Sequence, residues 1–349
     1  MCARPSRRRL LQTLGLAAAG GLAGCSSDGQ EQTPTVTGTP PGPEQPDAGE
    51  IPPYADFIPD SLDLVLCTVS DLQVEPGHRV GKPPEAVSDP LRYSSMSAAS
   101  VGSGLELSVL GGALGLPSPE FGFERRRLDT TSISRALAVG TVGVLELPVD
   151  LSGAIADAED GAGTVEFEAE DRAVIADANG AVAGLTTDAV VFTPPLVDAG
   201  SPERIRDIVD TRAGARQPKH EADDGFASLL AEADTTGHLA CGYAADRDLE
   251  AVAQARASSS PVSIPTEEFG GATGAVFRID LDNGDDPQPA SGVMQFPDGT
   301  SLDLEAATSS VGSAAADRSV TRDDGTVRVT GTYSWEALAA FEGTLADLL

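Results

Sequence analysis

The clearest structural signal in this chain is Asp324-Gly325-Thr326-Val327-Arg328-Val329-Thr330-Gly331-Thr332-Tyr333. Asp-Gly favours a tight turn because both residues accept positive φ, and the β-formers that follow predict a strand over Val327–Tyr333. Three further dipeptides of this kind occur: Asn179-Gly180, Asn283-Gly284 and Asp298-Gly299. We expect at least three of the four to close antiparallel hairpins, so a wholly parallel sheet is disfavoured.

Other strands are predicted wherever short apolar and β-branched runs are bounded by turn residues. These strands are Leu62–Val69, Val142–Leu147, Val165–Glu168, Ala189–Phe192 and Ala275–Leu281.

Helices are predicted between these strands. Ser201-Pro202-Glu203 is a helix start signal, and Gly214 stands where a C-terminal cap belongs. An apolar stripe with spacing i, i+3, i+4, i+7 runs from Phe226 to Ala233, and a last helix is expected to begin at Ser334. The predicted fold class is α+β, a largely antiparallel sheet with packed helices.

The folded body is predicted to have two lobes, 54–217 and 218–349. A weak internal echo suggests that they are similar, because Leu64-Val65-Leu66-Cys67 resembles His238-Leu239-Ala240-Cys241. A second echo, between segments starting at Thr141 and Thr326, has a different offset, so a duplication requires an insertion in one half. The best candidate for a linker is Gly214–Asp224.

The N-terminus has the order of an export signal. Arg4 and Arg7-Arg8-Arg9 form a positive region, Leu10–Gly24 is apolar but too short to span a bilayer, and small residues precede Cys25. The segment around Arg7, Arg8 and Arg9 resembles the twin-arginine signal, whose export machinery carries folded proteins. Leu22-Ala23-Gly24-Cys25 resembles a lipobox, which implies that Cys25 receives a diacylglycerol. The alternative is a short buried helix that happens to begin with arginines.

This resemblance implies a location. Residues 1–24 are predicted to be a signal peptide, and Cys25 to anchor the chain to the outer face of the cell membrane without a transmembrane helix. Residues 25–53 are rich in Pro, Thr, Gly, Glu and Gln, so they are predicted to form a disordered, extended tether.

Acidic residues dominate the chain, with 54 Asp and Glu against 23 Lys and Arg. Loss of residues 1–24 removes four Arg and no acid, which changes the formal charge from −31 to −35. Molar salt shortens the Debye length to about 3 Å and screens this repulsion. The acid excess, the preference for arginine over lysine and the few aromatics resemble secreted lipoproteins of haloarchaea. An acidic face for a basic partner or for cations is the alternative, and nucleic acid is an unsuitable ligand for this charge.

Two cysteines remain informative, because Cys2 leaves with the signal peptide and Cys25 is acylated. Cys67 and Cys241 lie in apolar, strand-like contexts outside the cytoplasm. A disulfide between neighbouring strands is one hypothesis, and two separately buried, inert thiols are the other.

Metal and catalytic signals are weak. Asp280, Asp282 and Asp285 at a predicted hairpin tip offer oxygens to Ca²⁺, but the spacing departs from an EF-hand loop, and an acidic solvated turn is favoured. The histidines are isolated in sequence. No catalytic motif and no cofactor signature is found, so no catalytic residue is assigned.

Three functions are therefore considered. We expect a non-catalytic, lipid-anchored surface protein that acts as a binding or envelope-associated module, with an unknown ligand. A solute-binding lipoprotein of a transporter is the alternative, and an extracellular hydrolase is third. A ligand-induced rise in melting temperature would favour the solute binder. A pocket with converging carboxylates, or an acid–histidine pair, would favour the hydrolase.

Overall fold

The structure is a computed structural model. It describes residues 49–71, 89–92, 94, 132–160, 163–176, 182–193, 202–233, 237–246, 249, 270–281, 287–297, 308–323, 325–334 and 337–338. The signal peptide, Cys25 and most of the predicted tether therefore lie outside the described residues.

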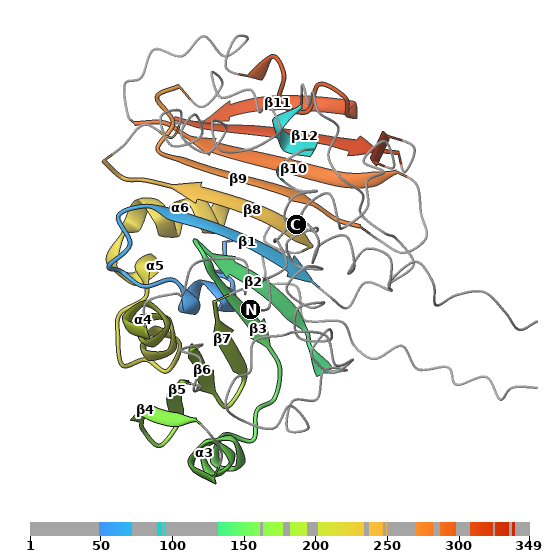
Figure 1. The fold of residues 1–349 in the computed structure, drawn as a ribbon. Helices are drawn as coiled ribbons and strands as arrows, with labels where there is room; N and C mark the ends of the chain where they lie inside the picture. Colours follow the sequence, from blue (N-terminus) through green and yellow to red (C-terminus); the bar gives the residue numbers. More distant parts are fainter. Residues whose placement is uncertain are drawn as a thin grey trace, which may run out of the picture.

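The described residues form one twelve-stranded antiparallel sheet with strand order β11-β12-β10-β9-β8-β1-β2-β3-β7-β6-β5-β4 (Figure 1). In chain order, the strands are β1 (Val65–Asp71), β2 (Arg135–Val139), β3 (Val142–Glu146), β4 (Thr164–Glu168), β5 (Arg172–Ala176), β6 (Val182–Thr186), β7 (Ala189–Phe192), β8 (His238–Tyr243), β9 (Gly274–Ile279), β10 (Gln288–Gln295), β11 (Ala316–Asp323) and β12 (Thr326–Tyr333).

The hairpin prediction is confirmed in three places. The described strands on either side of Asn179-Gly180, Asn283-Gly284 and Asp324-Gly325 are paired antiparallel, as β5–β6, β9–β10 and β11–β12. Of these three dipeptides, only Gly325 is among the described residues. Asp298-Gly299 lies outside the described residues; the described strands before and after it, β10 and β11, are both paired with β12 and not with each other. The sheet dominates the described residues, so packed helices are a smaller part of the fold than the sequence suggested.

One face of the sheet, here called the helix face, carries most of the described helices. It packs against the 3-10 helix η1 (Pro53–Phe57), α4 (Pro202–Arg212) and α6 (Asp224–Glu232). In Figure 1, α4, the short α5 (Lys219–Ala222) and α6 lie side by side along it. The opposite face has two separate apolar clusters, one under α3 (Leu151–Asp160) and one over β9, β10 and β12.

Helix α4 forms where the sequence predicted it. Pro202 lies at its start, and Gly214 has φ +71°, which a residue without a side chain adopts at low cost. Ile205, Ile208 and Val209 are buried against β5, β6 and β7, and each contributes about 2 kcal/mol by leaving water. Amphipathic spacing alone therefore identified the face that packs on the sheet.

The predicted linker 214–224 is packed against the body. Pro218 forms a β-bridge with Pro59, and the Lys219 amide donates to the Ile58 carbonyl at 2.7 Å. The sheet also crosses the predicted boundary at 217/218, because β1 pairs with β8 along six residues.

Candidate functional site

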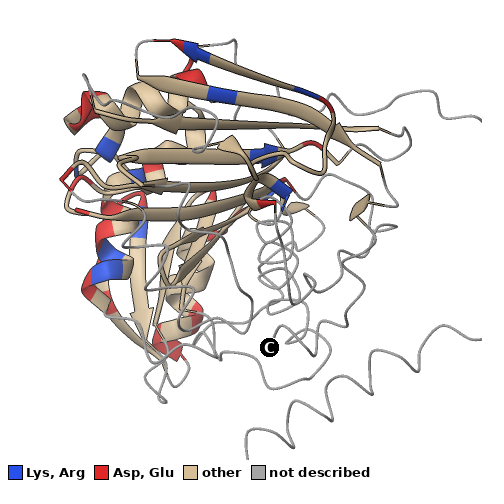
Figure 2. Ribbon diagram, turned by 90° about the horizontal axis from the view of Figure 1, so that it is seen from above, with Lys and Arg blue, Asp and Glu red and all other residues tan. Residues whose placement is uncertain are grey.

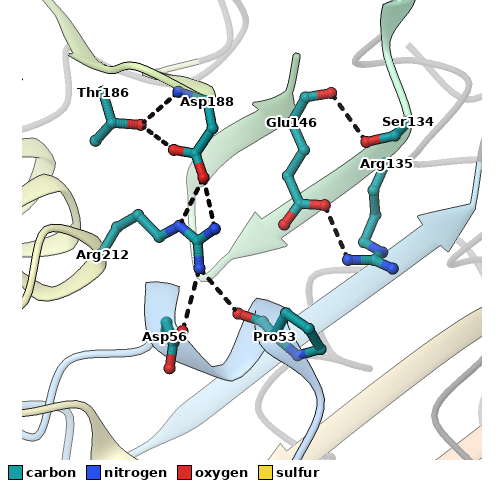
Figure 3. Close-up of polar contacts among 8 residues, drawn as sticks. All are labelled: Pro53, Asp56, Ser134, Arg135, Glu146, Thr186, Asp188 and Arg212. Atoms are coloured by element: carbon teal, nitrogen blue, oxygen red, sulfur yellow. Dashed lines mark hydrogen bonds and ion pairs between the residues drawn. The ribbon is translucent and has the colours of Figure 1, made fainter. Parts of the chain in front are cut away.

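A cluster of charged side chains lies on the helix face around Arg212, the last residue of α4 (Figure 3). Its Nε and Nη2 donate to Asp188 Oδ2 at 3.2 and 2.5 Å. Its Nη1 donates to Asp56 Oδ2 at 3.1 Å and to the Pro53 carbonyl at 3.4 Å. Thr186 Oγ1 donates to the other oxygen of Asp188 at 2.7 Å. One guanidinium thus joins α4, η1 and the β6–β7 turn.

A second ion pair lies beside the first. Arg135 and Glu146 are register partners on β2 and β3, and their side chains meet at 2.8 Å. The Ser134 hydroxyl donates to the Glu146 backbone carbonyl at 3.3 Å. Aromatic rings support both guanidinium groups, since Arg212 lies 4.9 Å from the centre of the Phe57 ring and Arg135 lies 5.8 Å from that of Tyr54.

Burial acts in the same direction on Glu146 and Asp188, but the net shifts of their pKa values have opposite directions. Desolvation raises the pKa of Glu146, and the nearby Arg135 opposes this only in part. Burial also acts to raise the pKa of Asp188, but hydrogen bonds from Arg212 and Thr186 outweigh it, so that pKa lies below its ordinary value. Every nitrogen of Arg212 donates to a partner, so this geometry holds elements together and keeps Asp188 ionised.

A different pair of polar residues lies where β1 meets β8. Ser70 Oγ and His238 Nδ1 are 2.7 Å apart, and both residues are buried. Burial lowers the pKa of His238 from 6.5 to about 4, so its ring is neutral at neutral pH. His238 was isolated in sequence, and folding supplies its partner from 168 residues away.

The two informative cysteines are directly opposite each other in the same strand pair. Cys67 of β1 is the register partner of Cys241 of β8, and both are buried on the helix face as free thiols. Their hydrogen bond, together with burial, raises the pKa of the Cys241 thiol. The structure therefore buries the two thiols next to each other and not separately. A disulfide between them stays a prediction.

Asp89 forms a third buried polar centre, which the sequence gave no reason to expect. Its carboxylate accepts hydrogen bonds from the Gly312 amide at 2.8 Å, the Ala314 amide at 3.0 Å and the Tyr333 hydroxyl at 2.8 Å. Burial and this carboxylate raise the pKa of Tyr333. These hydrogen bonds hold residues 312–314 against the end of β12, so the role of Asp89 is structural.

The other predicted site residues are placed as follows. Arg7, Arg8, Arg9, Cys25, Asp282 and Asp285 lie outside the described residues. Asp280, the remaining calcium candidate, pairs with Arg278 at 3.0 Å. Within the described ranges, no three His, Cys, Asp or Glu side chains are grouped as metal ligands. None of the described helices has the length and hydropathy needed to cross a membrane.

An open depression of about 690 Å³ lies beside the start of α3. Asp150, Ser152, Glu168 and Glu170 are among the residues that line it. Asp150 already accepts hydrogen bonds from Ser152 Oγ and the Gly153 amide, both at 3.1 Å. The depression therefore begins at an ordinary helix cap.

No family model and no curated protein matches the chain. Among solved structures, the chain is similar to TP0453 in its crystal form I, with a TM-score of 0.37 and 7% identity over 86% of this chain and 99% of that one. A likeness this weak carries no argument about fold or function.

Proposed function

We propose that this chain is an exported, lipid-anchored surface protein, and that its body is a non-catalytic binding or envelope-associated module adapted to high salt. The observation that carries the proposal is the order of Arg7-Arg8-Arg9, the apolar run and Leu22-Ala23-Gly24-Cys25. The acidic composition is the second support, because such a charge suits concentrated salt.

The distribution of charge in the body is compatible with this proposal. Figure 2 shows acidic and basic residues along the helices and at strand ends, and few over the middle of the sheet. Arginines take part in ion pairs across different elements, such as Arg172 with Asp210 at 2.7 Å and Arg212 with Asp188. These pairs offset part of the acid excess where carboxylates are partly buried.

We also propose that the two predicted lobes, 54–217 and 218–349, are related by duplication. From the centre of the sheet outward, one half has the order β1-β2-β3-β7-β6 and the other β8-β9-β10-β12-β11. In each half a single strand is followed by two hairpins in the same spatial arrangement, and β4–β5 is an additional hairpin in the first. The echo around Cys67 and Cys241 falls on the central pair, where the two sequences run antiparallel and in register.

The anchor is tested by expressing the full chain in a halophilic host as wild type, Cys25→Ser and Cys2→Ser. We expect wild type and Cys2→Ser to partition with membranes and to carry a lipid on Cys25 by mass spectrometry. Cys25→Ser should be released or remain unprocessed. An unmodified, full-length wild-type chain in the cytosol, or a processed Cys25→Ser chain that stays with membranes, would contradict the proposal.

The binding role is tested with the membrane-derived wild-type chain in molar salt. A screen of small metabolites followed by melting temperature should identify no tight ligand if the module binds an envelope component. A clear rise in melting temperature with one metabolite would instead support the solute-binding alternative, because binding stabilises the native state by mass action.

A further inference from the structure

The pair Cys67–Cys241 lies at the point where the two halves of the sheet join. Residues 65 to 70 of β1 pair with residues 243 to 238 of β8, so each step forward from Cys67 matches a step backward from Cys241. The two cysteines therefore lie near the centre of the seam between the halves.

The position of the two thiols fits a covalent bond. Directly opposite residues in an antiparallel pair have Cα atoms about 4.5–5.5 Å apart, within the range of about 4.4–6.8 Å that a disulfide spans. Both side chains project to the helix face, where Cys67 is 2% and Cys241 is 5% exposed. The thiols already contact each other, so bond formation needs no change of register.

We propose that Cys67 and Cys241 form a disulfide after the chain has folded, and that this bond staples the two halves together across the β1–β8 seam. The timing rests on the proposed export of a folded chain, which would bring two paired thiols from a reducing into an oxidising compartment. Folding creates the site, and oxidation then locks it.

The reaction is an exchange with a low-molecular-weight disulfide. The thiolate of one cysteine attacks that disulfide, forms a mixed disulfide and releases one small thiol. The second cysteine then attacks the protein sulfur, forms the Cys67–Cys241 bond and releases a second small thiol. Two cysteines are oxidised, one small disulfide is reduced to two thiols, and the two cysteine protons end on the released thiols.

The staple should act mainly on the unfolded chain. It closes a loop from residue 67 to residue 241, and long loops lose the most chain entropy when they are cross-linked. We expect the oxidised protein to melt about 10 °C higher than the reduced protein.

Peptide mapping tests the bond directly. Free thiols in the full wild-type chain are blocked at lysis, and the chain is cleaved after glutamate, which separates residues 51–75, with Cys67, from residues 233–250, with Cys241, and from Cys25. Membrane-derived chain should yield 51–75 linked to 233–250. Purified reduced chain, folded in molar salt and treated with oxidised glutathione, should form the same link with a loss of two hydrogens in mass.

Folded chain that keeps both thiols free after oxidised glutathione would overturn the inference. So would equal melting temperatures of the oxidised and reduced wild type. The matched control is Cys67→Ala with Cys241→Ala, whose melting temperature should not respond to reductant. Retention of the chain in the cytosol would overturn the proposed export and not the staple, because oxidation of the purified chain is measured independently.

Discussion

The buried pair of Ser70 and His238 should make the stability of this protein depend on pH. The perturbation is a change from about pH 7 to about pH 5, at constant molar salt. His238 is buried in the fold, and its pKa falls from 6.5 to about 4 when the chain folds. The unfolded chain therefore binds the proton more readily than the native chain does.

The sign and size follow from these two values. Because the pKa is lowered on folding, the stabilisation is present above about pH 6.5 and is lost as the pH falls toward 4. Between about pH 7 and about pH 5, this one group should remove about 2 kcal/mol from the free energy of unfolding. Protonation of His238 in the fold costs free energy because the buried, charged ring would be hydrogen-bonded to the neutral Ser70 hydroxyl and not to a counter-ion.

The assay is urea unfolding followed by circular dichroism at both pH values. His238→Gln should lose about 2 kcal/mol less than wild type over this range, whatever its own stability at pH 7. The comparison of the two proteins isolates His238, because the rest of the chain is the same in both. An identical loss in wild type and His238→Gln would refute the reasoning.

Three further measurements test the body of the protein. Arg212→Met should destabilise it by about 1 kcal/mol, because the half-exposed Asp188 and Asp56 lose their partner, while the exposed Arg204→Met on the same helix should cost less than about 0.5 kcal/mol in urea unfolding. Gly184→Ala should cost about 1–3 kcal/mol, since its Cβ would lie 2.4 Å from Val209 Cγ2, whereas a Cβ at Gly242 would have its nearest contact at 3.7 Å and should cost less. Lowering salt from molar to physiological levels should reduce the melting temperature, because repulsion between carboxylates is no longer screened; an unchanged melting curve would contradict the salt adaptation.

Local patterns predicted a good part of the fold. The strand Ala189–Phe192 was predicted with its observed bounds, and Val142–Leu147 differs from β3 by one residue. The helices predicted after Ser201 and over Phe226–Ala233 also form, as α4 and α6. Of the helix predicted to begin at Ser334, only Ala337 and Leu338 are described as helical, and residues 335–336 and 339–349 lie outside the described residues. These successes have one cause, which is that apolar periodicity and turn residues act over a few positions.

Two of the strands that were not predicted, β10 and β11, lack those local signals. β10 contains Pro289 and Gly292, which normally argue against a central strand, yet it lies between β9 and β12. The residue at 292 must be small because a Cβ there would lie 2.7 Å from the Phe277 ring. β11 is polar on both sides because it is an edge strand with mostly exposed side chains, so it has no apolar alternation to detect.

The sequence by itself located the hairpins β5–β6, β9–β10 and β11–β12 and the apolar faces of α4 and α6, and it predicts export and a lipid on Cys25, because each of these depends on residues close together in the chain. Only the tertiary structure placed Cys67 opposite Cys241, gave His238 its partner Ser70, and brought Asp188 to Arg212. The physical reason is that these contacts depend on the register in which distant strands pair. Pairing between β1 and β8 depends on which faces of the whole sheet are buried, and no short segment encodes that choice.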